Sequence, residues 1–177
     1  MRVAITTLVL AGFALLIQGQ AQRIARDETP GEHAKHPLKE QLNEIIDTRD
    51  SPQGLTVTIP DLFFDTGKAT LTTVAQERMA KAGQILAGHP GVRIEVNGYT
   101  DNAGDPKSQH ELSQERADSA KSILIQQGVP TPAISARGLG DANPVASNDT
   151  AAGRQQNRRV ELVVSSDSIG TQATSAH

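Results

Sequence analysis

The stretch Val96–Ala117, VNGYTDNAGDPKSQHELSQERA, contains an acidic residue and an arginine in unusual positions. Asp101 closes an alternating apolar segment, and Arg116 follows fifteen residues later. At about 100° per residue, a helix through this region places Arg116 about 40° from Leu112, inside the arc of apolar side chains. A guanidinium buried there needs an acceptor, because an unpaired buried charge costs several kcal/mol.

Asp101 is the nearest acidic residue by topology, because it follows the strand that precedes this helix. Ligands of open α/β sheets bind at the edge where strands lead into helices. An Asp/Arg pair placed there is suited to holding a small zwitterion. The residues alone leave two other interpretations open: a structural Asp–Arg bridge that holds the loop, or an arginine stem that snorkels to water.

The composition indicates one domain with tails. The chain has 177 residues, a formal net charge of −3, no cysteine and 2% aromatic residues, so the core must be aliphatic. The mild acidity argues against nucleic acid as a partner, since phosphate binding needs a clustered basic surface. Without cysteine there is no disulfide, no thiolate zinc site and no lipid-modified cysteine.

Residues 1–21 have the features of a secretory signal peptide. Arg2 supplies the positive start, Val3 to Ile17 are apolar, and Gly19-Gln20-Ala21 forms a small-x-small cleavage pattern. The apolar run is shorter than the ~20 residues that a membrane span needs. We therefore expect export to the periplasm. Cleavage after Ala21 is favoured, and the alternative is retention of this segment as an anchor.

The rest of the chain divides into three parts. Residues 22–54 are predicted to be a linker with a short amphipathic helix from Leu38 to Thr48, which either packs on the domain as a lead-in or dimerises. Residues 55–165 form the predicted domain, and residues 166–177 form a small, polar tail that we expect to be disordered.

Within residues 55–165 the pattern changes between strand and helix. Thr73 and Gln76 resemble a capping box, and Gly128 ends a second helix that starts near Ser108. The predicted fold is an α/β (α+β) two-layer sandwich in the order β-α-β-α-β-β, with a mixed four-stranded sheet and helices on one face. A long loop, 138–157, is expected before the last strand.

The sequence contains no convincing enzyme motif. Asp65-Thr66-Gly67 matches the D-T-G of aspartic proteases, but those enzymes pair two such carboxylates on a nearly all-β fold. The histidines have no metal-ligand spacing, and no nucleophile with a matching base is evident. We therefore predict no catalysis, no metal and no cofactor.

Four sequence blocks, in this order and spacing, resemble the OmpA-like peptidoglycan-binding domain family. They are FFDTGKATL, GYTDNAG, LSQERA and PVASNDTAAGRQQNRRVEL, and the resemblance covers about Leu55 to Ser165. It implies non-covalent binding of peptidoglycan through the meso-diaminopimelate of its stem peptide. It also implies a place in the cell envelope, in association with the cell wall or outer membrane, with outer-membrane or other envelope proteins as further partners.

The resemblance assigns roles to particular residues. Asp101 is expected to hold the ligand's ammonium and Arg116 its carboxylate. Secondary positions are Thr100 and Asn102 beside the aspartate, Asp65 and Arg158 in blocks that border the family's pocket, and Gln109, which stands where many relatives have asparagine. The alternative is an envelope scaffold or assembly partner of the same fold, in which the Asp/Arg pair is only structural.

Overall fold

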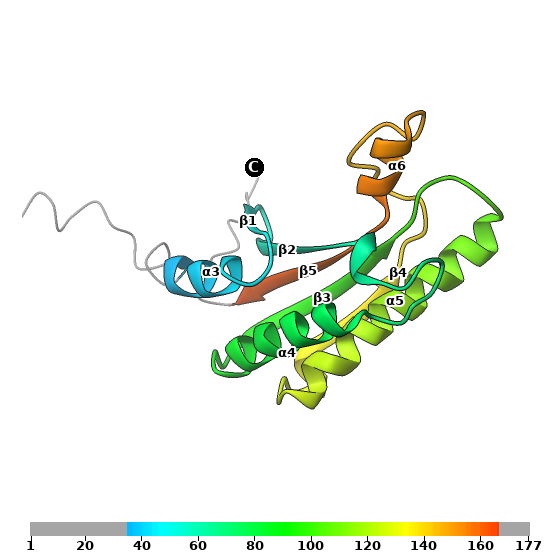
Figure 1. Cartoon of the computed structure of the whole chain (residues 1–177). Coiled ribbons are helices and arrows are strands. Elements are labelled where there is room, and N and C mark those ends of the chain that lie inside the picture. The colour runs from blue at the N-terminus through cyan, green and yellow to red at the C-terminus, as the bar shows by residue number, and fades with distance from the viewer. Residues whose placement is uncertain (1–34, 167–177) are drawn as a thin grey trace, which may run out of the picture.

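The computed structural model describes residues 35–166, which form one mixed sheet with helices against one face (Figure 1). The predicted signal peptide, the first part of the predicted linker and the tail from residue 167 lie outside the described residues. The strands are β1 (Thr48–Ser51), β2 (Gly54–Pro60), β3 (Val92–Tyr99), β4 (Ile134–Gly138) and β5 (Arg159–Ser166). The helices are α3 (Lys35–Asn43), α4 (Thr73–Ala87), α5 (Pro106–Gln126) and α6 (Ala151–Asn157), with short 3-10 turns η1 (Asp61–Phe63) and η2 (Thr131–Ala133).

The sheet order is β1-β2-β5-β3-β4. Among the strands between residues 35 and 166, only β3 and β4 pair in parallel, and α5 forms the crossover between them. Because β5 runs antiparallel to both β2 and β3, the last residues of β2 and β3 meet the first residues of β5 at one end of the sheet. This end carries the candidate site.

The predicted fold class is confirmed, but the sheet within the described residues has five strands where four were expected. The additional strand, β1, is short and polar, so it has no alternating apolar pattern by which to recognise it. It falls where the first predicted helix was expected to end. That helix stops at Asn43, whose side-chain oxygen accepts the Thr48 N–H at 3.0 Å.

Helix α3 packs against the domain. Leu38 is 2% exposed and Leu42 is fully buried, and both belong to the same core as the sheet. The helix contacts β1, β2 and α4. The folded unit therefore starts before Leu55.

Two other elements differ in detail from the sequence prediction. Helix α4 is capped by Thr72, one residue before the predicted position. The Thr72 side chain accepts the Ala75 N–H. The expected loop 138–157 contains helix α6, which Thr150 caps by accepting the Gly153 N–H. A helix of this length carries too little periodicity to be read from sequence.

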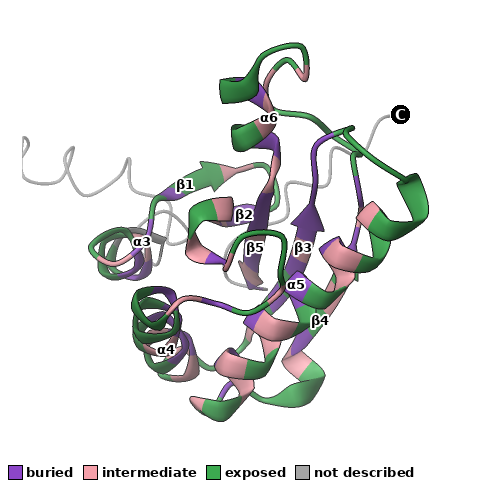
Figure 2. Ribbon diagram, turned by 45° about the vertical axis from the view of Figure 1, so that its right-hand side comes forward, coloured by how far each residue is buried: buried purple, intermediate pink, exposed green. Residues whose placement is uncertain are grey.

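The core lies between the sheet and the layer formed by α3, α4 and α5, where strands and inward helix faces are buried (Figure 2). Alternation along each strand directs Val57 and Leu162 into this core and Thr58 and Glu161 to the helix-free face. Helix α5 approaches the sheet closely because glycines face it. A Cβ on Gly98 would lie 2.0 Å from the Ser113 carbonyl oxygen. This close approach brings Arg116, one turn further along α5, beneath the end of the sheet.

Candidate functional site

Asp101 lies in the loop that follows β3 and is 5% exposed. The loop is fixed on both sides: the Thr100 N–H donates to the Gly140 carbonyl at 2.7 Å, and Asp101 Oδ1 accepts the Ala103 N–H at 3.0 Å. This Asx-type turn holds the carboxylate at the strand end and leaves Oδ2 for another partner.

Helix α5 starts a few residues later and carries Arg116 into the interior. Asp105 caps the helix, and hydrogen bonds from the backbone and side chain of Ser108 lower the pKa of its carboxyl group. Arg116 is 2% exposed and lies on the buried face of the helix with Ser113 and Ala117. Its position inside the apolar arc is confirmed.

Three groups surround the Arg116 guanidinium. Nε donates to the Lys68 carbonyl at 3.0 Å, and the centre of the Phe64 ring lies 4.9 Å from the guanidinium carbon. Nη1 lies 2.8 Å from Asp61 Oδ1. Despite this distance, Nη1 has no hydrogen bond of acceptable geometry. The contact is therefore a charge attraction that leaves an N–H of the guanidinium without an aligned acceptor.

Arg116 does not pair directly with Asp101, the acidic residue nearest to it by topology, so the structure contains no direct Asp101–Arg116 bridge. Instead, four charged side chains form a chain, in which Arg158 and Asp61 lie between Asp101 and Arg116. Arg158 Nη1 contacts Asp101 Oδ2 at 2.6 Å, and Arg158 Nε contacts Asp61 Oδ2 at 2.8 Å. The chain Asp101–Arg158–Asp61–Arg116 is held by the backbone too, because the Asp61 N–H donates to the Arg158 carbonyl at 3.0 Å.

The two end members of this charge chain are more buried than the two middle members. The side chains of Arg116 and Asp101 are 2% and 7% exposed, whereas those of Asp61 and Arg158 are 23% and 32% exposed. Burial acts to lower the pKa of Arg158, but its hydrogen bonds to Asp61 and Asp101 outweigh that effect and leave the pKa raised. Asp61 and Arg158 are thus the members of the charge chain that are most accessible to solvent.

A second polar atom at this site lacks a partner. The hydroxyl of Thr100, a residue that is 2% exposed, has no hydrogen bond within the described part of the chain. Buried hydroxyls are normally hydrogen-bonded, and leaving one unmade costs about 1–3 kcal/mol. Thr100 and Arg116 therefore both have unused hydrogen-bonding capacity at the same end of the sheet.

The other predicted residues are placed less centrally. Asn102 is exposed. Asp65 lies in the turn that presents the Lys68 carbonyl to Arg116, and its backbone N–H donates to the Thr70 carbonyl. The side chain of Gln109 donates to the Ala103 carbonyl, so it orders the loop around Asp101.

Sequence analysis missed Asp61 as a site residue. The residue follows Pro60 at the end of a strand, just as Asp101 follows β3. The signal was available only from topology: once β5 is placed between β2 and β3, both strand ends and Arg158 must meet.

Between residues 35 and 166, no group of three or more His, Cys, Asp or Glu side chains is placed to hold a metal ion. None of the helices in that range has the length and apolar character needed to cross a membrane.

Comparison with known proteins identifies the family. The sequence profile of the OmpA family matches residues 63–158. The probable lipoprotein YiaD of Escherichia coli (strain K12) is 45% identical over 105 residues, which cover 59% of this chain and 48% of that protein. The peptidoglycan-binding protein ArfA of Mycobacterium tuberculosis (strain ATCC 25618 / H37Rv) is 39% identical over 108 residues, which cover 61% of this chain and 33% of that protein.

A solved structure supports the same assignment. The crystal structure of the periplasmic domain of Helicobacter pylori MotB (residues 78-256) matches with a TM-score of 0.61 and 29% identity, over 68% of this chain and 81% of that one. The chain spans about half the length of YiaD and a third of that of ArfA. The chain belongs to the OmpA family, whose profile covers most of the folded part.

Proposed function

We propose that this domain binds peptidoglycan without covalent attachment, through the meso-diaminopimelate of the stem peptide. Family membership supports peptidoglycan as the ligand, as does the likeness to a relative named for peptidoglycan binding. The charged side chains and the unpaired polar atoms at the end of the sheet support diaminopimelate as the part of the polymer that is recognised. Diaminopimelate presents an ammonium and a carboxylate on one carbon, so one site can recognise both charges together.

In this proposal Asp101 binds the ammonium and Arg116 binds the carboxylate. A guanidinium holds a carboxylate through two parallel hydrogen bonds, a geometry that a lysine cannot reproduce. Arg116 is already oriented for this contact by the Lys68 carbonyl and by the ring of Phe64. The unpartnered hydroxyl of Thr100 supplies a third group beside Asp101.

In the free protein, Asp61 and Arg158 occupy the places that the ligand's charges take. Asp61 contacts Arg116 where the ligand's carboxylate would bind, and Arg158 contacts Asp101 where the ligand's ammonium would bind. A zwitterion replaces both contacts at once. A ligand with a single charge would replace only one of the two contacts, so the site should favour the amino-acid group of the stem peptide, whose two charges engage both buried groups.

One observation carries the proposal. Two nearly buried, opposite charges, Asp101 and Arg116, lie at the same end of the sheet without pairing to each other, and more exposed side chains bridge them. A purely structural ion pair would be expected to close directly.

The alternative, an envelope scaffold in which these charges are only structural, is favoured by the fact that every member of the charge chain already has a partner. Co-sedimentation with purified peptidoglycan sacculi separates the two functions. Our proposal predicts that the protein sediments with sacculi and that soluble meso-diaminopimelate releases it. A folded protein that stays in the supernatant would support the scaffold.

The proposed location follows from the proposed ligand. Export to the periplasm gives access to peptidoglycan, and the predicted signal peptide in residues 1–21 provides the route. The domain would then tether or organise the envelope, with outer-membrane or other envelope proteins as partners.

A further inference from the structure

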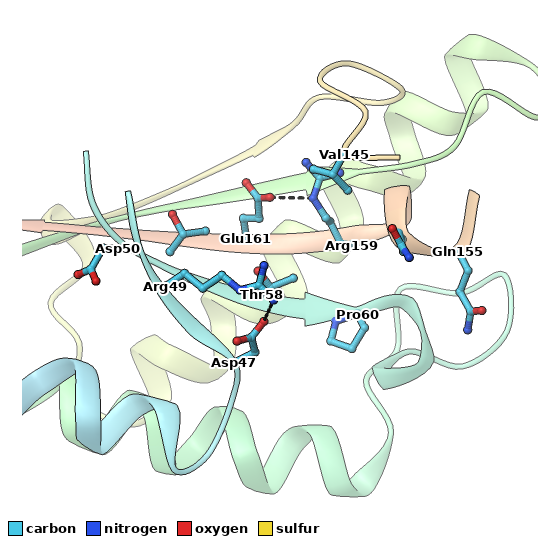
Figure 3. A pocket seen from close by; sticks show the side chains of 11 residues that line it. Asp47, Arg49, Asp50, Thr58, Pro60, Val145, Gln155, Arg159 and Glu161 are labelled. Carbon is cyan, nitrogen blue, oxygen red and sulfur yellow. Dashed lines mark hydrogen bonds and ion pairs between the residues drawn. The ribbon is translucent and has the colours of Figure 1, made fainter. Parts of the chain in front are cut away.

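A pocket of about 590 Å³ lies next to β1, β2, β5 and α6 (Figure 3). Its volume falls within the range of small-molecule sites, about 300–1,000 Å³. Thr58 and Pro60 come from β2, Arg159 and Glu161 from β5, and Gln155 from α6. The remaining lining residues are Asp47, Arg49, Asp50, Thr56, Val145 and Gln156.

Each charged side chain of this β2–β5 pocket is already paired within the protein. Arg49 contacts Asp47 at 2.9 Å, Arg159 contacts Glu161 at 2.7 Å, and Asp50 pairs with Lys39 of α3. A charged ligand would therefore compete with an internal counter-charge at each of these side chains.

Arg159 is the most strongly held of these residues. It is 4% exposed, its two terminal nitrogens donate to the carbonyls of Asn157 and Asn143, and it stacks 4.0 Å from the ring centre of Tyr99. Its donors point to protein acceptors. It forms a fixed wall of the pocket and has little left with which to bind an anion.

The uncharged polar side chains of the pocket, in contrast, have no partner among the described residues. The side chains of Thr56, Thr58, Gln155 and Gln156 make no hydrogen bond to other described residues. Hydroxyls and primary amides both donate and accept, as sugar hydroxyls and N-acetyl groups do. Pro60 and Val145, the latter 58% exposed, add apolar surface for the C–H faces and acetyl methyl groups of such a ligand.

We infer that the β2–β5 pocket binds the N-acetylated amino-sugar units of a peptidoglycan glycan strand. This inference rests on the proposed function, because one polymer supplies both ligands. The two sites are also adjacent along the chain: Pro60 lines the pocket while Asp61 belongs to the charge chain, and Arg159 and Arg158 are divided in the same way. A cell-wall fragment carrying both sugar and stem peptide would therefore gain affinity by occupying two linked sites.

The test is a titration of the isotopically labelled protein with the trimer of N-acetylglucosamine, followed by NMR. The side-chain amides of Gln155 and Gln156 and the backbone amide of Thr58 should shift in a saturable way. The double variant Thr56→Val/Thr58→Val keeps the side-chain volume and removes two hydroxyls, so the trimer should bind about tenfold more weakly. Thr131→Val, at an exposed threonine outside the pocket, is the matched control and should leave trimer binding unchanged.

The two proposals fail separately. In the double variant the affinity for meso-diaminopimelate should stay at the wild-type value, and in Asp101→Asn the trimer should still bind. Pocket amides that do not respond to the trimer would overturn the inference whatever diaminopimelate does. So would a response of the same amides to the free stem peptide, because the pocket would then be a peptide site.

Discussion

Asp61 Oδ1 lies 2.8 Å from Nη1 of Arg116, and this contact joins η1 to the buried face of α5. The same carboxylate contacts Arg158 through its other oxygen, so one partly exposed acid bridges two guanidiniums, and Asp101 supplies the second negative charge. The site at the end of the sheet is therefore electrically satisfied before any ligand arrives. Binding would exchange internal ion pairs for ligand ion pairs.

Asp61→Asn should destabilise the free protein, since it leaves Arg116 buried beside an uncharged amide. The expected loss in the free energy of unfolding is about 3 kcal/mol, at the low end for a broken buried pair because Asp61 keeps some solvent contact. Urea unfolding measures it. Saturating meso-diaminopimelate should restore part of the loss, because its carboxylate takes over the vacated position. A variant as stable as wild type would show that Asp61 does not stabilise Arg116.

Thr100→Val should affect stability and binding in opposite directions. The hydroxyl is buried without a partner, so an isosteric methyl group should stabilise the free protein by about 1 kcal/mol. The affinity for meso-diaminopimelate should fall about fivefold, the value of one lost hydrogen bond. Urea unfolding and calorimetric titration measure the two effects. A destabilised variant with unchanged affinity would mean that the hydroxyl serves the fold.

Gly138→Ala tests the close approach of α5 that places Arg116. A Cβ at this position would lie 2.5 Å from the Gln114 backbone nitrogen, so helix and strand must separate. We expect a loss of about 3 kcal/mol in the free energy of unfolding. Gly88→Ala is the control, because its Cβ would meet nothing closer than 3.3 Å and its φ of −74° suits alanine. Equal stability of the two variants would refute the packing argument.

Tyr99 is the single tyrosine in a chain without tryptophan, so its ionisation can be followed directly by ultraviolet absorbance. Burial, and then the charge of Glu161, raise its pKa above the ordinary value of 10.0. The folded state thus favours the neutral phenol. Its contribution to stability is complete below about pH 10 and declines as the pH rises through the folded pKa. Glu161→Gln should lower that pKa, and an unchanged titration would exclude a charge effect.

Sequence patterns predicted the parts of the fold that depend on periodicity. The alternation of Val92, Ile94 and Val96 predicted β3, and the apolar arc of α5 predicted the burial of Arg116. Strand β1 and helix α6 were missed because they are short and polar, and their positions depend on a hairpin and a cap.

The candidate site was predictable by residue but not by pairing. Asp101 and Arg116 were recognised from a strand end and a helix face. Their partners depend on strand order, since β5 brings Arg158 between the ends of β2 and β3. Local sequence gives no information on that order, and so the role of Asp61 could be found only in three dimensions.

Calorimetric titration of free meso-diaminopimelate tests the central claim most directly. The wild-type protein should bind it, and Asp101→Asn and Arg116→Lys should each weaken binding by about 100-fold or more. The first variant removes the charge that holds the ammonium, and the second loses the two parallel hydrogen bonds to the carboxylate. Urea unfolding must show that both variants remain folded. Affinity unchanged in both folded variants, or no heat of binding with the wild type, would contradict the account.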